Sequence, residues 1–162
     1  MPASRRTRVS LLTEAIIARV GTFVGSQILV SLLGAVFIAI FSALLGLPSP
    51  VAIGIIIFIC GLVPLIGHFL GCAIVTIIAL TQSASVGLIA FVGYVLYVQV
   101  ENYVIHPRIM KRNLAVPGAV TIISAMIGTS LLGLVGGLLA VPVAASVILI
   151  LAEVVFPRAE KS

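Results

Sequence analysis

The distribution of charged residues along the chain constrains its fold more than any other feature. The chain has 162 residues, and neither the stretch between Arg19 and Glu101 nor that between Arg112 and Glu153 contains a charged side chain. A run of about 18 apolar residues is already typical of a transmembrane helix. Apolar residues make up 62% of the chain and charged residues only 8%, too few to cover a soluble surface. The sequence therefore predicts an all-α integral membrane protein and excludes a soluble enzyme, a disulfide-rich secreted scaffold and a disordered chain.

The basic residues lie in short clusters beside the apolar stretches. The net charge is +5, but nucleic-acid surfaces gather their basic residues on one folded face, often with stacking aromatics. Clusters that flank apolar spans instead follow the positive-inside rule. If every cluster is cytoplasmic, both termini are cytoplasmic and the chain is a multi-pass protein of the bacterial inner membrane. The clusters are Arg5, Arg6 and Arg8; Arg108, Lys111 and Arg112; and Arg158 and Lys161.

These clusters also define the domain organisation that we expect. Residues 1–19 read as a cytoplasmic polar or amphipathic segment, residues 20–152 as a single multi-pass transmembrane domain, and residues 153–162 as a cytoplasmic tail. The apolar stretch after residue 19 is too long for the core of a signal peptide.

The first half of the transmembrane domain predicts a long helix followed by a broken pair. Residues 20–45 carry no charge and are long enough to cross a hydrocarbon core of about 30 Å. A Gly/Pro cluster at residues 46–50 ends this helix. Two short apolar arms follow, at residues 51–63 and 68–80, around a break that contains Pro64 and Gly67. They are either two thin spans or a re-entrant hairpin.

The second half repeats this order. Residues 84–105 predict a second long helix that Pro107 stops. Apolar arms at residues 119–132 and 138–152 then flank a glycine-rich break with Gly133 and Gly136, and Pro142 lies in the second arm. Interrupted segments in corresponding positions of two halves are typical of an inverted-repeat transporter core.

The polar end of the second long helix supplies candidates for a transport pathway. Glu101 is the acid nearest the middle of the apolar sequence, and burying it costs about 2.5–3.5 kcal/mol on insertion scales, so it should face protein or water. One interpretation is a polar pathway lining in which Glu101 or His106 carries a proton or binds a cation. The interpretation that we favour is a structural latch at the headgroup level, with Glu101 paired to Arg108 or Arg112. The candidate residues are Gln99, Glu101, Asn102 and His106.

Other residues read as structural. Helical periodicity places Tyr94, Tyr97 and Glu101 on one stripe, and His68 reads as a hydrogen-bonded histidine rather than a ligand. Cys60 and Cys72 lie in apolar sequence without a ligand set, which favours buried apolar side chains. No catalytic motif is present. We therefore expect no enzymatic activity, no cofactor and no metal.

Four stretches together resemble the autoinducer-2 exporter family of bacterial membrane proteins. They are LLGLP at residues 44–48, VPLIG at 63–67, QVENYVIHPRIM at 99–110 and LGLVGGLLAVP at 132–142. The third is similar to the family's Q-x-x-E-N…P-x-x-M signature, with a tighter Gln–Glu spacing here. The chain looks like the C-terminal half of a family member. The positions that match family motifs are Pro64, Gly67, Glu101, Asn102, Pro107, Gly133, Gly136 and Pro142.

The resemblance implies a transporter core that exports a small polar or amphipathic solute, such as autoinducer-2, by alternating access. Some relatives of this family are proposed to exchange sodium for protons, so H⁺ or Na⁺ is the expected coupling ion. The expected partners are the lipid bilayer, the solute, the coupling ion and further copies of the chain, but no nucleic acid. The alternative is a non-transporting membrane subunit or an inactive C-terminal fragment that acts through helix packing.

Overall fold

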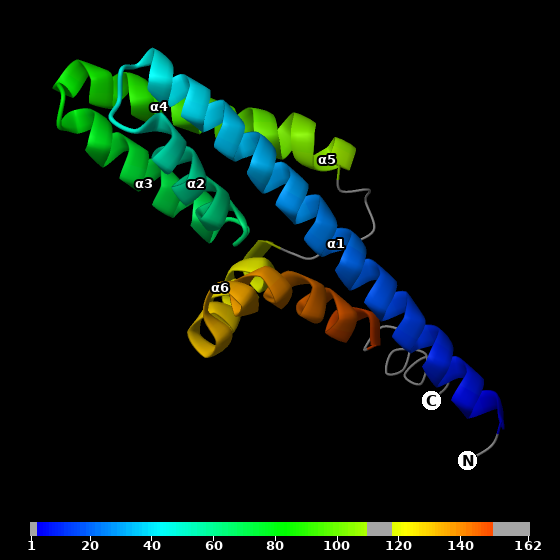
Figure 1. Ribbon diagram of the computed structural model, residues 1–162. Coiled ribbons are helices and arrows are strands. Elements are labelled where there is room, and N and C mark those ends of the chain that lie inside the picture. Colours follow the sequence, from blue (N-terminus) through cyan, green and yellow to red (C-terminus); the bar gives the residue numbers. More distant parts are fainter. Residues whose placement is uncertain (1–2, 110–117, 151–162) are drawn as a thin grey trace.

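The chain folds into helices in the order that the sequence predicts. The computed structural model describes residues 3–109 and 118–150, and every regular element in these ranges is a helix (Figure 1). The predicted tail at residues 153–162, Lys111 and Arg112 lie outside them. The order long helix, broken pair, long helix, broken pair is therefore confirmed. The elements are α1 (Ala3–Leu44), α2 (Pro50–Gly61), α3 (Ile66–Leu80), α4 (Ala84–Val100), the π-helix η1 (Glu101–Ile105), α5 (His106–Ile109) and α6 (Gly118–Ile150).

Helix α1 is longer than the apolar stretch that predicted it. It has 42 residues and is about 63 Å long at 1.5 Å per residue. Its segment Thr13–Leu44 is long and apolar enough to cross a membrane, as are Ala84–Ile109 and Ala119–Ile148. The helix shows no boundary near residue 19, so the amphipathic N-terminal segment is a continuation of the first spanning helix.

The turn after α1 is built by Gly46. This glycine has φ 68°, a left-handed conformation that favours glycine. The Gly46 N–H donates to the Ala43 carbonyl at 3.0 Å, and the Leu47 N–H donates to the Ser42 carbonyl at 2.9 Å, which together form a Schellman cap. The Gln82 side chain donates to the Gly46 carbonyl at 2.6 Å. The α1–α2 turn and the α3–α4 turn therefore lie at the same end of the bundle.

Helices α2 and α3 form a hairpin that reaches the middle of the α1 span. They have 12 and 15 residues, or about 18 and 22 Å. At the end of the hairpin that carries the break, Gly61 packs against Ser31 and its carbonyl accepts a hydrogen bond from Gln27. Both partners lie near the centre of Thr13–Leu44. The pair runs along part of α1 and turns back (Figure 1), as a re-entrant hairpin would.

The second long helix does not stop at Pro107, which corrects the prediction. The Ser83 hydroxyl caps the start of α4 by accepting from the Val86 N–H at 3.2 Å. After Val100 the helix widens into the π-helical turn η1 and then continues through Pro107 to Ile109. A proline removes one backbone donor, and a local π-turn accommodates its ring without ending the helix.

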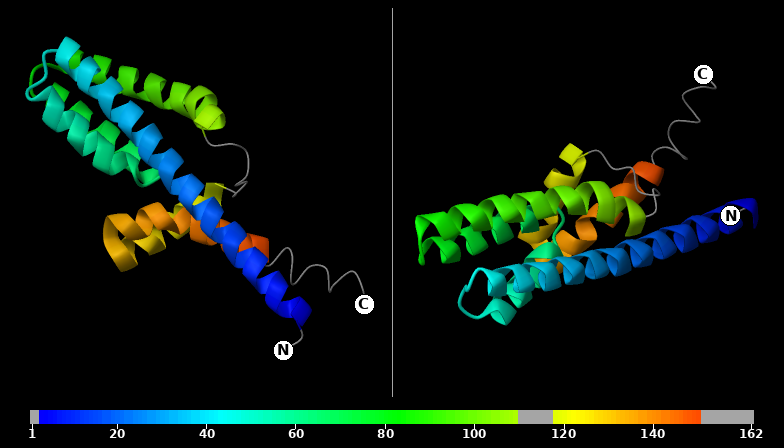
Figure 2. Two further views of the ribbon diagram at one scale, coloured as in Figure 1. Left: turned by 45° about the vertical axis from the view of Figure 1, so that its right-hand side comes forward. Right: turned by 90° about the horizontal axis from the view of Figure 1, so that it is seen from above.

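Helix α6 contains the second predicted break and folds back on itself. Leu132 (φ −129°, ψ 15°) and Gly133 (φ 61°, ψ −141°) interrupt its helical geometry, while Gly136 and Gly137, which we expected in the break, are helical. A Cβ at Gly128 would overlap the Gly136 carbonyl oxygen, and one at Gly136 would overlap the Gly128 carbonyl oxygen. The two arms therefore approach each other backbone to backbone, and the ribbon of α6 folds back on itself (Figure 1 and Figure 2).

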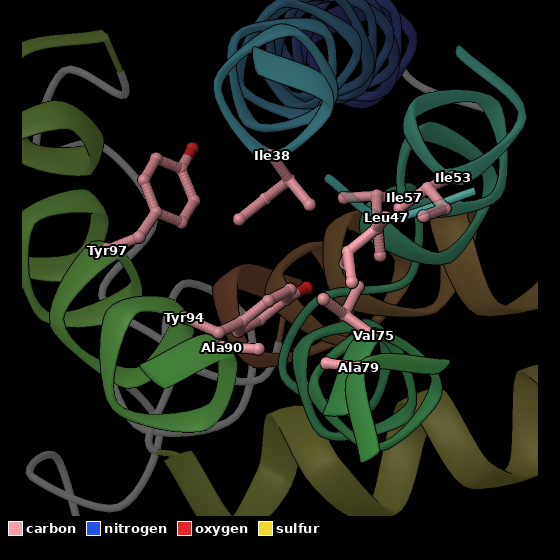
Figure 3. Packing of buried hydrophobic residues seen from close by; sticks show 9 residues of the cluster. All are labelled: Ile38, Leu47, Ile53, Ile57, Val75, Ala79, Ala90, Tyr94 and Tyr97. Carbon is pink, nitrogen blue, oxygen red and sulfur yellow. The ribbon is translucent and has the colours of Figure 1, made fainter. Parts of the chain in front are cut away.

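A small apolar core lies between helices α1, α2, α3 and α4. Many large apolar side chains face outward instead. Tyr94 and Ile38 are nearly inaccessible and project toward each other (Figure 3). By contrast, Phe69 is 78% exposed and Leu88 63% exposed. Exposed apolar area on this scale is typical of a surface that faces lipid. The core cluster comprises Ile38, Leu47, Ile53, Ile57, Val75, Ala79, Ala90, Tyr94 and Tyr97.

Candidate functional site

The break between α2 and α3 is a strained and tightly packed turn. Leu65 has φ 65° and ψ −60°, and the Ile66 N–H donates to the Pro64 carbonyl at 2.8 Å, which together make a γ-turn of the rare, strained kind. A Cβ at Gly67 would overlap the Cys60 carbonyl oxygen, so only glycine fits there. Pro64 and Gly67, both predicted as motif positions, thus shape a backbone that ends its helices at mid-span.

Helix α1 presents a polar stripe to this break. The Gln27 amide donates to the Gly61 carbonyl at 2.7 Å and is 1% exposed. Ser31 is 4% exposed, and its hydroxyl would lie 3.1 Å from a Cβ at Gly61. Gly34 follows on the same face, since residues four and three apart lie together on a helix. The stripe therefore covers one of the carbonyl groups that α2 leaves open at its end.

The π-helix η1, which continues α4, brings a buried carboxylate to the same place. Glu101 is 1% exposed, and its Oε1 lies 2.7 Å from His68 Nε2, one residue beyond Gly67. A Cβ at Gly34 would lie 2.9 Å from the Tyr97 hydroxyl and 3.5 Å from Glu101 Oε2. A neutral imidazole donates a hydrogen bond to a carboxylate, and a protonated one adds an ion pair. The predicted stripe of Tyr94, Tyr97 and Glu101 is therefore buried and faces α1.

The π-helical turn is what adds His106 to this cluster. Residues five apart in an α-helix point about 140° away from each other, since each residue advances about 100°. In a π-turn the hydrogen bond runs over five residues, so such a pair stacks. The His106 N–H donates to the Glu101 carbonyl, and His106 Nε2 lies 3.6 Å from Glu101 Oε1. In a regular α-helix Asn102, four residues before His106, would be its neighbour instead.

The favoured interpretation of Glu101 as a latch is wrong for Arg108. Within the described residues, the ion-pair partners of Glu101 are His68 and His106 and not Arg108; Arg112 lies outside these residues. Glu101 also packs against Gly34, well inside the span Thr13–Leu44. The π-turn and the α2–α3 hairpin together place histidines closer to the carboxylate than any arginine of the described chain.

Two oxygens in this cluster have no hydrogen-bond partner among the described residues. They are Gln27 Oε1 and Ser31 Oγ. Buried polar atoms are normally paired, because an unpaired one loses its interaction with water. We define the mid-span polar cluster as Gln27, Ser31, His68, Tyr97, Glu101 and His106.

The remaining predicted residues lie apart from this cluster or at its edge. Gln99, Asn102 and Pro107 are exposed on the outer side of the helix. Gly133 lies at the kink of α6, Gly136 packs on the opposite arm, and Pro142 is buried in the second arm. The two breaks are nevertheless neighbours, because a Cβ at Gly137 would lie 2.9 Å from the Val63 side chain.

Sequence reasoning missed Gln27 and Ser31. A signal was present, since Gln27 is the single amide side chain between residues 20 and 45 and Ser31 follows one helical turn later. Polar residues four apart lie on one face of a helix, and intramembrane polar residues mark packed or functional faces.

Comparison with known proteins places the chain in a family. A sequence model described as "AI-2E family transporter" matches residues 1–156. The chain is 30% identical over 144 residues to YrrI of Bacillus subtilis (strain 168), covering 89% of this chain and 41% of YrrI. It is 30% identical over 148 residues to YueF of the same organism, covering 91% of this chain and 40% of YueF.

A relative in another genus matches in the same way. MT0215 of Mycobacterium tuberculosis (strain CDC 1551 / Oshkosh) is 28% identical over 145 residues, covering 89% of this chain and 40% of that protein. The names of all three describe inferred transport proteins. The chain thus spans about two fifths of the length of these relatives. No solved structure matches it.

Proposed function

The chain belongs to the AI-2E family of transporters, and from this premise we propose that it forms a core that exports a small polar or amphipathic solute, such as autoinducer-2, by alternating access. Membership of this family implies a bacterial cell-membrane protein and a role in transport rather than catalysis. The solute, the mechanism and the coupling are the parts that we propose. The proposal extends the activity of the longer relatives to this chain.

One observation carries the proposal. Glu101, a carboxylate with 1% exposure, lies 2.7 Å from a histidine of the broken α2–α3 hairpin inside the apolar span. An intramembrane acid is costly and is kept where it serves an ion or substrate pathway. Broken helices at mid-span are the usual place for such a pathway, because their open backbone groups require protein or water around them.

The arrangement supports a simple coupling mechanism. The Glu101–His68 contact joins η1 to α3, so H⁺ or Na⁺ that binds the carboxylate competes with His68 for it. Weakening this contact frees the α2–α3 hairpin to move against α1 and α4. A ligand shifts such an equilibrium only through its different affinity for the two states, and the carboxylate–histidine contact supplies that difference.

The orientation and assembly belong to the proposal as well. Cytoplasmic N- and C-termini follow from the positive-inside rule, with the α1–α2 turn and the α3–α4 turn on the outer side. In this orientation the α2–α3 hairpin enters from outside and ends at the mid-span polar cluster. We expect several copies of the chain to associate in the membrane.

Flux through proteoliposomes that contain the full-length protein tests the proposal. Glu101→Gln keeps the shape of the side chain and removes its charge, so we expect solute flux driven by a proton or sodium gradient to fall to the uncoupled level. Glu14→Gln is the matched control, because Glu14 is an exposed acid near the start of the α1 span. Equal gradient-driven flux in wild type and Glu101→Gln would contradict the coupling role. No flux of any solute under any gradient would favour the non-transporting alternative.

A further inference from the structure

The polar stripe of α1 carries an inference beyond coupling at Glu101. We propose that Gln27 and Ser31 form a second subsite that binds a hydrogen-bond donor group of the solute, a hydroxyl or an ammonium. The inference rests on the proposed transport function, since it names the class of solute that the same cluster accepts. It concerns residues that no sequence motif of the chain includes.

The two oxygens are unpaired and almost fully buried. Gln27 Oε1 and Ser31 Oγ have no hydrogen-bond partner, although Gln27 is 1% exposed and Ser31 is 4% exposed. They belong to residues four apart on one face of α1, beside the end of the broken helix α2. Two unpaired groups on one face of a helix in an apolar bundle favour a polar occupant, because a buried polar group without a partner is destabilising.

The geometry determines what kind of group fits. The Gln27 amide nitrogen is already used by the Gly61 carbonyl at 2.7 Å, so its oxygen is the atom left for a ligand. A carbonyl oxygen only accepts, so the Gln27 oxygen requires a donor, and the Ser31 hydroxyl can accept from the same group. The subsite therefore recognises a donor.

The neighbouring Glu101 carboxylate makes the subsite disfavour negatively charged solute groups. Gly34, one turn after Ser31 on α1, packs against Glu101 Oε2 and the Tyr97 hydroxyl. Glu101 therefore lies beside the turn of α1 that follows the subsite. An anionic group would meet the Gln27 oxygen, which only accepts, and the negative charge of Glu101, and both disfavour it. The subsite should therefore accept alcohols and amines and exclude carboxylates.

Cysteine labelling of the full-length protein in proteoliposomes measures access to the subsite without requiring transport. Ser31→Cys is made in a Cys60→Ala, Cys72→Ala background and treated with a cationic ethylammonium thiosulfonate or an anionic ethylsulfonate thiosulfonate. We expect the cationic reagent to react about tenfold faster than the anionic one. Ser42→Cys is the matched control, because Ser42 is also a buried, unpaired hydroxyl on α1 but lies far from the break. It should react slowly with both reagents.

Protection by small solutes identifies the class of ligand. Glycerol and ethylammonium should each slow labelling of Ser31→Cys by about threefold or more at concentrations a few times their dissociation constants, whereas acetate should not. Adding Gln27→Met, which removes the acceptor and keeps the side-chain length, should abolish this protection. Thermal unfolding of each variant in detergent checks that it is folded.

The labelling outcomes test the existence of the subsite, and the flux outcomes test transport, so the two proposals can fail separately. Labelling of Ser31→Cys at the slow rate of Ser42→Cys would overturn the proposal, as would equal rates with both reagents or protection by acetate. Donor-selective protection without any flux would support the subsite and contradict the transport function. Flux without protection would support transport and overturn the subsite. Where only glycerol or only ethylammonium protects, the result assigns the donor as a hydroxyl or an ammonium.

Discussion

The two broken helical pairs of this protein look alike in sequence and differ in what surrounds them. The α2–α3 break packs against α1 and lies beside Gln27, Ser31 and the Glu101–His68 contact. The α6 break is exposed, since Leu131 is 75% and Leu132 69% accessible, and a Cβ at Gly133 would meet no atom within 4 Å.

The difference shows that a helix break does not by itself make a site. Both breaks leave backbone groups without helical partners, and a close backbone approach that requires glycine lies beside each of them. Only the first receives polar side chains from two other helices. The chemistry of a broken helix therefore depends on its neighbours, and the variants that follow test how far the two breaks differ.

The largest loss of stability is expected from a substitution at Gly67, where the α2–α3 break is most tightly packed. Gly67→Ala places a Cβ onto the Cys60 carbonyl, and this overlap should lower the free energy of unfolding by about 3 kcal/mol. Gly25→Ala has nothing within 4 Å of the new Cβ and should be neutral or stabilising by up to about 1 kcal/mol. Unfolding midpoints in detergent measure both. A Gly67→Ala variant as stable as wild type would show that this break is loosely packed.

A smaller loss of stability is expected when His68, the partner of the buried Glu101 carboxylate, is removed. His68→Ala leaves Glu101 Oε1 without the contact at 2.7 Å and should cost about 2 kcal/mol, as for other hydrogen bonds to charged groups. His106→Ala removes a contact of 3.6 Å by a more exposed side chain and should cost less than about 1 kcal/mol. The same unfolding assay compares them. The reverse order would mean that the π-turn, rather than the α2–α3 hairpin, holds Glu101.

Removing the Gln27 cap at the end of α2 should lower the free energy of unfolding by about half as much as His68→Ala. Gln27→Met removes the buried donor to the Gly61 carbonyl at 2.7 Å and should cost about 1 kcal/mol. Gln82→Met removes an exposed bond of similar length to the Gly46 carbonyl and should cost about 0.5 kcal/mol or less. Equal costs in the unfolding assay would indicate that water reaches Gly61 as freely as Gly46.

The smallest effect should come from the exposed break of α6. Leu132→Ala truncates a side chain that is 69% accessible and should change stability by less than about 0.5 kcal/mol in detergent. Val63→Ala at the other break truncates a side chain that is 6% accessible and should cost about 1 kcal/mol. If Leu132→Ala proves the more damaging, α6 is covered by protein in the assembled transporter, and the contrast between the breaks disappears.

The sequence alone determined the elements of this protein. Charge-free stretches predict membrane helices because a bilayer excludes charge, and Pro/Gly clusters predict the breaks because they disrupt the backbone ladder. The family resemblance followed from motifs at these breaks and at Glu101. Pro107 was misread because a proline alone does not reveal whether a π-turn will accommodate it.

Only the tertiary structure decided what surrounds Glu101. Gln27, His68 and Glu101 are separated by 40 and 32 intervening positions, and no periodicity within one helix relates residues on three different helices. Their meeting depends on where the α2–α3 hairpin ends along α1 and on a π-turn that rotates His106 by part of a turn. Both depend on packing between helices, because in lipid it is close packing and satisfied polar groups that select one arrangement among many.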